Sequence, residues 1–191
     1  MRDRLIAFEA EVAREFEEGK IKGPIHLSGG NEDQLIAVFK HVKPEDWVFS
    51  TWRNHYHALL HGIHPERVME EIRAGRSMNL TFPEHRFYSS AIVGGILPIA
   101  TGVASALKMK GCGRKVWCFI GDMAATTGAF HEANTYASKQ DLPITFVIED
   151  NGLSTNTPTD EVWGLGWVGK VRHYPYKRVH PHVGTGKWVT V

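Results

Sequence analysis

The sequence has little of what marks several classes of protein. Its 191 residues include only two cysteines, and 22 lysines and arginines stand against 21 aspartates and glutamates, for a formal net charge of +1. Because positive and negative side chains are almost equal in number, the chain as a whole has no electrostatic field that would favour nucleic acid or an anionic membrane. Cys112 and Cys118 make no metal-like pair. Because both are expected to be unpaired and no signal peptide is recognised, the sequence predicts a reducing, cytoplasmic location.

Long apolar runs are also missing. The longest stretch without charge includes 91–107, a segment interrupted by two adjacent glycines, a proline and a further glycine. It therefore predicts a buried core helix with its lead-in, and no membrane span. The length suits one well-cored domain. We expect an α/β domain over 1–160 and an irregular C-terminal tail over 161–191, where glycines and prolines punctuate the chain and no period persists.

What is present is a predicted βαβ unit. The apolar runs 116–120 and 144–148 have the composition of buried parallel strands. Between them, a helix is expected to be capped by Thr126 or Thr127 and stopped by Pro143. Such a unit brings the carboxyl ends of both strands to one sheet edge, where open α/β sheets bind ligands. Spacing and turn residues predict further helices, a strand and a loop: helices over 5–16, 31–39, 54–60, 65–74 and 98–110, a strand over 47–51 and a loop over 75–91.

Two oxygen-bearing side chains stand at these strand ends. Asp122 follows the first strand, and Asn151 follows the second, 29 positions later. A carboxylate oxygen, an amide oxygen and room for a backbone carbonyl after Asn151 suit Mg²⁺, which keeps water and completes its shell with substrate phosphates. The alternative is an ordinary strand-end aspartate.

The spacing and flanks of this pair resemble the thiamine-diphosphate motif, which begins Gly-Asp-Gly and ends in Asn just under thirty residues later. Three further segments extend the likeness to the α subunit of the thiamine-diphosphate-dependent 2-oxo acid dehydrogenases (pyruvate, branched-chain and acetoin types): Ile-His-Leu-Ser-Gly-Gly-Asn-Glu at 25–32, Ser-Thr-Trp-Arg-Asn-His at 50–55 and Ala-Ile-Val-Gly-Gly-Ile-Leu-Pro at 91–98. The resemblance covers roughly 20–160. It implies a three-layer αβα fold with a mostly parallel sheet, truncated at its C-terminal side.

The resemblance also implies roles for single residues. Asp122, Asn151 and the carbonyl of Leu153 would hold Mg²⁺. Backbone groups of three residues, Gly121, Met123 and Ala124, would line the diphosphate, although Met123 replaces a motif glycine. Arg53 would meet the diphosphate, since its planar fork suits paired oxygens; the alternative is a surface arginine.

The same carry-over gives roles nearer the reacting groups. Trp52 would pack beside the arginine, with ordinary core packing as the alternative. Ala91, in place of a usual glycine, and Val93 would meet the aminopyrimidine ring through their backbone. His55 is the candidate catalytic residue, as a proton relay near the substrate.

The implied function is decarboxylation of a small 2-oxo acid by an oligomeric enzyme in which this chain is the α-type subunit. A β-type subunit would supply the glutamate that activates the cofactor; Glu32 is the weaker candidate for that acid and is expected to favour its helix terminus. The alternatives are a transketolase-like half-subunit and a degenerate relative that binds or assembles without turnover.

Other histidines and the basic tail are expected to be solvated. His57 and His61 lie four apart, which predicts a solvent-facing or partner-facing helix stripe in preference to a metal site. The tail could imitate the family's loop of active-site histidines and an arginine, but a solvated segment is favoured for its basic residues, Arg172, His173, Arg178, His180 and His182.

Overall fold

The structure, a computed structural model, describes residues 1–163 and 171–189 and is built around one large sheet. In spatial order the six strands are β2 (Thr81–Phe82), β3 (Phe87–Ser89), β1 (Trp47–Ser50), β4 (Val116–Gly121), β5 (Ile144–Asp150) and β8 (Val171–Pro175). Only β2 runs antiparallel to its neighbour. The expected α/β fold with a mostly parallel sheet is confirmed.

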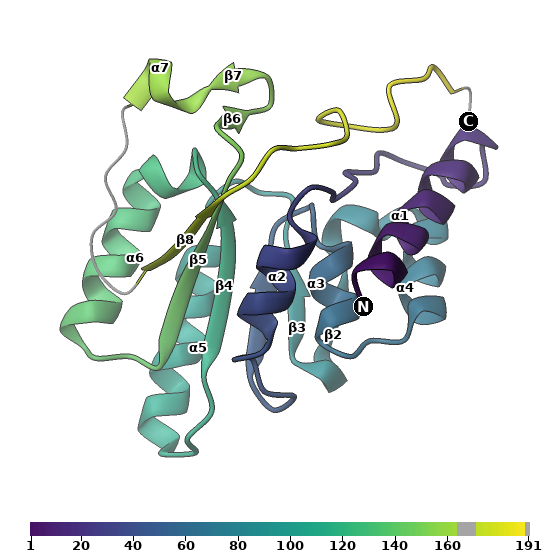
Figure 1. Cartoon of the computed structure of the whole chain (residues 1–191). Coiled ribbons are helices and arrows are strands. Elements are labelled where there is room, and N and C mark those ends of the chain that lie inside the picture. The colour runs from purple at the N-terminus through teal and green to yellow at the C-terminus, as the bar shows by residue number, and fades with distance from the viewer. Residues whose placement is uncertain (164–170, 190–191) are drawn as a thin grey trace.

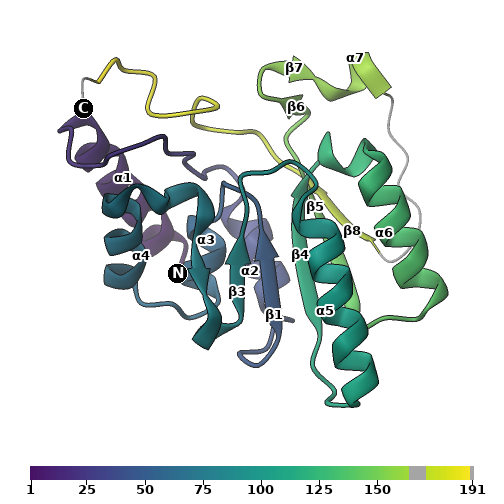
Figure 2. The same ribbon diagram turned by 180° about the vertical axis from the view of Figure 1, so that it is seen from behind.

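Helices cover both faces of this sheet (Figures 1 and 2). One layer is formed by α1 (Arg2–Glu17), α2 (Glu32–Phe39), α3 (His55–Leu60) and α4 (Pro65–Glu71), and the other by α5 (Ile96–Lys110) and α6 (Gly128–Lys139). In β4, Trp117 and Phe119 join the core under the first layer, while Cys118 and Ile120 join the core under the second. Because both faces are buried, the central strands β4 and β5 are mostly apolar up to their carboxyl ends, where β5 carries Glu149 and Asp150.

Shorter elements complete the described chain. They are a π-helical turn (Ile72–Arg76), 3-10 turns (Ser77–Asn79, Pro83–His85 and η4, Ala124–Thr126), a hairpin of β6 (Leu153–Ser154) with β7 (Thr157–Pro158), and α7 (Thr159–Trp163). No helix of the described residues combines the length and the apolar character that a bilayer crossing requires.

Two segments differ from the sequence prediction. The region 75–91, predicted as a loop, contains β2 and β3, and β3 pairs in parallel with β1. The tail is predicted to be irregular over 161–191, of which 164–170 and 190–191 lie outside the described residues. Its described part begins in a helix that ends at 163 and contains β8, which pairs in parallel with β5. Neither β3 nor β8 shows an apolar sequence pattern that predicts a strand; in β8 only Tyr174 is buried. Hydrogen bonding to a buried neighbouring strand determines their conformation.

Candidate functional site

A cavity of about 360 Å³ opens at the carboxyl edge of the sheet. Most of its walls come from the ends of β1, β3, β4, β5 and β8 and the segments that follow them, so five parallel strands deliver residues to one crevice. The cavity brings together nearly all of the residues predicted from the sequence: Trp52, Arg53, Ala91, Val93, Gly121, Asp122, Met123, Ala124, Asn151 and Leu153.

Asp122 is a buried carboxylate of this cavity, with 1% of the residue exposed. Burial raises the pKa of Asp122, and the nearby charge of Asp150 raises it further, although a hydrogen bond from the Thr159 hydroxyl opposes both effects. Thr159 lies at the start of α7, which the chain reaches through the hairpin after Asn151. A carboxylate held away from water in this way favours a bound cation over solvent.

Asn151 is fixed beside it by two hydrogen bonds. Its Oδ1 accepts from the Leu153 N–H at 2.9 Å, and its Nδ2 donates to the Tyr176 hydroxyl oxygen at 3.1 Å. An amide oxygen has two lone pairs, so Oδ1 keeps one for a ligand. A carboxylate, an amide oxygen and a backbone carbonyl are the hard donors that Mg²⁺ takes, and the residues present therefore fit that ion.

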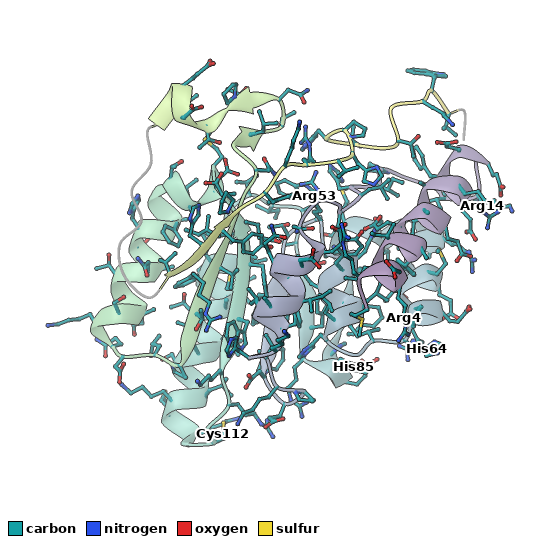
Figure 3. All side chains as sticks on the ribbon, viewed as in Figure 1. Arg4, Arg14, Arg53, His64, His85 and Cys112 are labelled. Atoms are coloured by element: carbon teal, nitrogen blue, oxygen red, sulfur yellow. The ribbon has the colours of Figure 1, made fainter. Side chains whose placement is uncertain are left out.

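Arg53 is held at another wall of the cavity. Its Nε donates to the Leu27 carbonyl oxygen at 3.0 Å, and its Nη2 donates to the His182 carbonyl oxygen at 3.3 Å. Figure 3 shows Arg53 beneath the yellow C-terminal segment. Trp52 lies next to it, with its ring centroid 5.9 Å from that of His26 in an edge-on arrangement. The guanidinium therefore belongs to the cavity wall and not to an open surface.

The tail is not uniformly solvated: Arg172 and His173 are exposed as predicted, but the prediction was wrong for two of the other basic residues. Arg178 and His182 line the cavity. Arg172 instead lies over the Trp117 ring, 5.5 Å from its centroid, and His173 Nε2 lies 2.8 Å from Asp150 Oδ2. Pairing of β8 with β5 directs the following residues back across the sheet edge, which no local pattern could indicate.

His55 is not among the cavity-lining residues. It is completely buried, with Nδ1 3.1 Å from Glu9 Oε1 and Nε2 2.9 Å from Ser77 Oγ. These contacts tie α3 to α1 and to the turn that contains Ser77. The proton-relay role stays a prediction that the geometry does not support by contact with the cavity.

His57 and His61 do not form an exposed stripe, which corrects the sequence prediction. His57 packs edge-on against Phe119, at 4.4 Å between ring centroids, and its Nε2 lies 3.2 Å from Glu149 Oε2. His61 Nε2 donates to the His85 carbonyl oxygen at 2.9 Å, and burial lowers the pKa of its imidazole. Helix α3 is short and packed between other elements, so helical spacing alone could not show that this side is buried.

Glu149 is a buried acid of the cavity wall to which the sequence assigned no role. Its Oε1 accepts hydrogen bonds from the Tyr174 hydroxyl at 2.6 Å and from Asn31 Nδ2 at 3.1 Å. Its position at the end of a predicted strand was the sequence feature that could have indicated a place in the cavity wall. Glu32, in contrast, is not a lining residue: its Oε1 accepts from the Gly30 N–H and from the Tyr56 hydroxyl, each at 3.1 Å.

His26 gives the site a pH-dependent contribution to stability. Burial, reinforced by the charge of Arg53, lowers the pKa of His26 from 6.5 to about 3. Below pH 6.5 the unfolded chain therefore binds a proton at His26 that the folded chain does not bind. The contribution of this residue to the free energy of unfolding is lost as pH falls below 6.5. We expect the free energy of unfolding to fall by about 2 kcal/mol between pH 7.5 and pH 5.

Urea unfolding at both pH values measures this loss. It should be smaller in His26→Phe than in the parent, whereas His41→Phe, at an exposed position, should behave like the parent. An unchanged loss in His26→Phe would contradict the assignment.

Comparison with known proteins identifies the family of the chain. The family model of the dehydrogenase E1 component matches residues 1–163. The pyruvate dehydrogenase E1 component subunit alpha of Rickettsia prowazekii is 35% identical over 160 residues, which are 78% of this chain and 49% of that protein. The acetoin:2,6-dichlorophenolindophenol oxidoreductase alpha subunits of Cupriavidus necator and Bacillus subtilis are 32% and 33% identical, over 80% and 79% of this chain and 49% and 48% of their own length. The chain thus spans about half the length of these relatives, and over that span it belongs to the dehydrogenase E1 component family.

Proposed function

We propose that the chain is the α-type subunit of a 2-oxo acid dehydrogenase and binds thiamine diphosphate through Mg²⁺. One observation carries the proposal: in a member of the E1 family, Asp122 and Asn151 line one cavity at the ends of the paired strands β4 and β5. The names of its relatives, pyruvate dehydrogenase and acetoin oxidoreductase alpha subunits, support a small 2-oxo acid or acetoin-type substrate.

The residues of the cavity have distinct tasks in this proposal. Asp122, Asn151 and the carbonyl of Leu153 hold the metal ion. The turn 121–124, which enters η4, lines the diphosphate through backbone groups, and Arg53 adds a charged fork. Ala91 and Val93, after β3, face the aminopyrimidine. Bound thiamine diphosphate supplies a carbon nucleophile and an electron sink.

The activating acid is assigned to a β-type subunit. Glu32, the only candidate that the sequence offered, is engaged by the Gly30 N–H and the Tyr56 hydroxyl and is not a cavity residue. Glu149 does line the cavity, but Tyr174 and Asn31 already hold it. This chain therefore provides half of the active site, and the partner completes it.

Calorimetric titration with thiamine diphosphate, with and without Mg²⁺, tests the cofactor assignment. We expect binding that requires the divalent ion. The titration is then repeated with a co-expressed β-type subunit, together with an assay of 2-oxo acid decarboxylation. Turnover of the mixed complex supports the enzyme. Tight cofactor binding without turnover in that complex would favour the non-catalytic relative, and absence of binding in both samples would overturn the proposal.

Replacement of Arg53 by lysine tests the guanidinium. Lysine keeps the charge but loses the planar fork and the Nη2 contact to His182, so we expect cofactor affinity to fall by about 1–3 kcal/mol. Arg67→Lys is the matched control, because Arg67 forms an exposed ion pair with Glu84. Calorimetry measures both variants, and an Arg53→Ala protein with parental affinity would exclude the residue from the site.

A further inference from the structure

Residues 176–186, here called the C-terminal strap, lie across the segment 25–30 although some 150 positions separate them in sequence. The Val179 N–H donates to the Gly29 carbonyl oxygen at 3.3 Å, and the Gly184 N–H donates to the Ile25 carbonyl oxygen at 2.9 Å. In Figure 1 the yellow segment leaves β8, crosses the sheet edge and runs toward α1. The strap is therefore a docked part of the fold and forms one wall of the cavity.

Gly30 is the point at which the strap packs most closely against the segment 25–30. Its φ is +91°, and a Cβ built there would lie 2.1 Å from the Lys177 carbonyl oxygen. That contact is to backbone, so a rotamer change cannot relieve it. The strap can approach 25–30 this closely only because position 30 is glycine. Gly30 itself does not line the cavity.

The strap places a second arginine in the cavity wall. Arg178 Nη1 donates to the Thr155 carbonyl oxygen at 3.1 Å, and its Nη2 donates to Asn156 Oδ1 at 3.4 Å. Both acceptors belong to the hairpin that follows Asn151. Through this contact Arg178 lies against the chain segment that carries the expected metal ligands, while the strap also holds Arg53 through the His182 carbonyl.

Direct ion pairing does not neutralise the charge of the two guanidiniums within the described residues. Among the residues that the structure describes, neither Arg53 nor Arg178 forms an ion pair with a carboxylate. Burial, and after it the charge of Arg53, lowers the pKa of Arg178. The two like charges repel each other in the half-buried cavity, and an anion bound by both would relieve that repulsion.

We propose that the strap completes an anion subsite in which Arg53 and Arg178 together bind a diphosphate. The inference rests on the proposed function, because it takes the diphosphate to be that of the cofactor. Planar guanidinium forks match paired phosphate oxygens, and the cavity places them with Asp122 and Asn151, whose metal ion would share the same anion. The carboxylate of a 2-oxo acid is the other anion with this chemistry, and the experiment separates the two.

Inorganic pyrophosphate with Mg²⁺ is the probe, titrated by calorimetry into the full chain. Arg178→Gln should weaken its binding about tenfold or more, as loss of a charge-assisted hydrogen bond does. Arg172→Gln is the control from the same tail, because Arg172 lies over Trp117 outside the cavity. Pyruvate is titrated in parallel. A loss of pyruvate binding with unchanged pyrophosphate binding would overturn the diphosphate assignment.

Gly30→Ala tests the strap without touching the ligand. It should displace the strap, reduce pyrophosphate affinity about as much as Arg178→Gln, and increase hydrogen exchange at the Val179 and Gly184 amides. Gly113→Ala is the control, since Gly113 has a similar positive φ and no neighbour within 4 Å of an added Cβ.

The outcomes also separate this inference from the proposed function. If Arg178→Gln and Gly30→Ala both keep parental pyrophosphate affinity while Asp122→Ala loses it, the strap inference is wrong and the cofactor site stands. If the parent binds pyruvate in an Arg178-dependent manner but neither pyrophosphate nor thiamine diphosphate, the strap carries an anion site of another kind, and both the diphosphate assignment and the cofactor proposal fall.

Discussion

Asp122→Ala is expected to abolish detectable Mg²⁺-dependent binding of thiamine diphosphate. Asp122 is the ionic ligand of the proposed set, and Mg²⁺ in such sites has few protein ligands to lose. The remaining donors, Asn151 and the Leu153 carbonyl, are neutral and cannot balance a divalent ion. Calorimetry at saturating Mg²⁺ measures the effect. Asp33→Ala is the control, because the Asp33 side chain is 75% exposed in a loose pair with Arg2.

Asp122→Asn separates binding from folding in the same experiment. Burial raises the pKa of Asp122, so the ionised carboxylate is unfavourable in the folded chain without a cation. A neutral amide of the same shape removes that penalty and can still accept a hydrogen bond from Thr159. We therefore expect Asp122→Asn to unfold at the same urea concentration as the parent or a higher one, yet to bind no cofactor. Parental affinity in this variant would exclude Asp122 as the metal ligand.

The central unit could be predicted from the sequence because its signals are local. The strand runs 116–120 and 144–148 are apolar except for Thr145, and Thr127 caps α6, with its Oγ1 accepting from the Phe130 N–H at 3.4 Å. Once two such strands are parallel and adjacent, the βαβ geometry places Asp122 and Asn151 at one edge. The predicted lining of the cavity follows from this step and from the family resemblance.

The rest of the site depends on contacts between distant segments. Tyr176 and Arg178 reach the cavity because β8 pairs with β5, and β8 has little apolar pattern of its own. Thr159 meets Asp122 only after the hairpin returns the chain across the strand end. His57 is buried because α3 packs between other elements. Sequence spacing records none of these long-range pairings, so the strap and its arginine could be found only in the folded chain.

The outer face of α5 and α6 suggests that the chain associates. A groove between these helices is lined largely by small and apolar side chains, including those of Gly102, Ala106 and Ala133, and its exposed apolar residues include Met109 at 85% and Tyr136 at 50%. Small residues let a second helix approach closely. A monomer seldom tolerates an apolar face of this kind in water, and obligate interfaces commonly bury more than about 2,000 Å² in total.

We therefore expect the isolated protein to be at least dimeric and the Ala106→Arg variant to lose this association. We also expect the isolated protein to be inactive on 2-oxo acids until a β-type subunit is added. The arginine would place a long charged side chain in the groove, where no carboxylate except that of Glu132 lines the wall among the described residues. Thr135→Arg is the control, since Thr135 is exposed on α6 but does not line the groove. Light scattering at micromolar concentration measures the mass of each protein. A stable monomeric parent would contradict the association, and decarboxylation by the parent alone would show that the chain supplies its own activating acid, with Glu149 and Glu32 then the residues to replace.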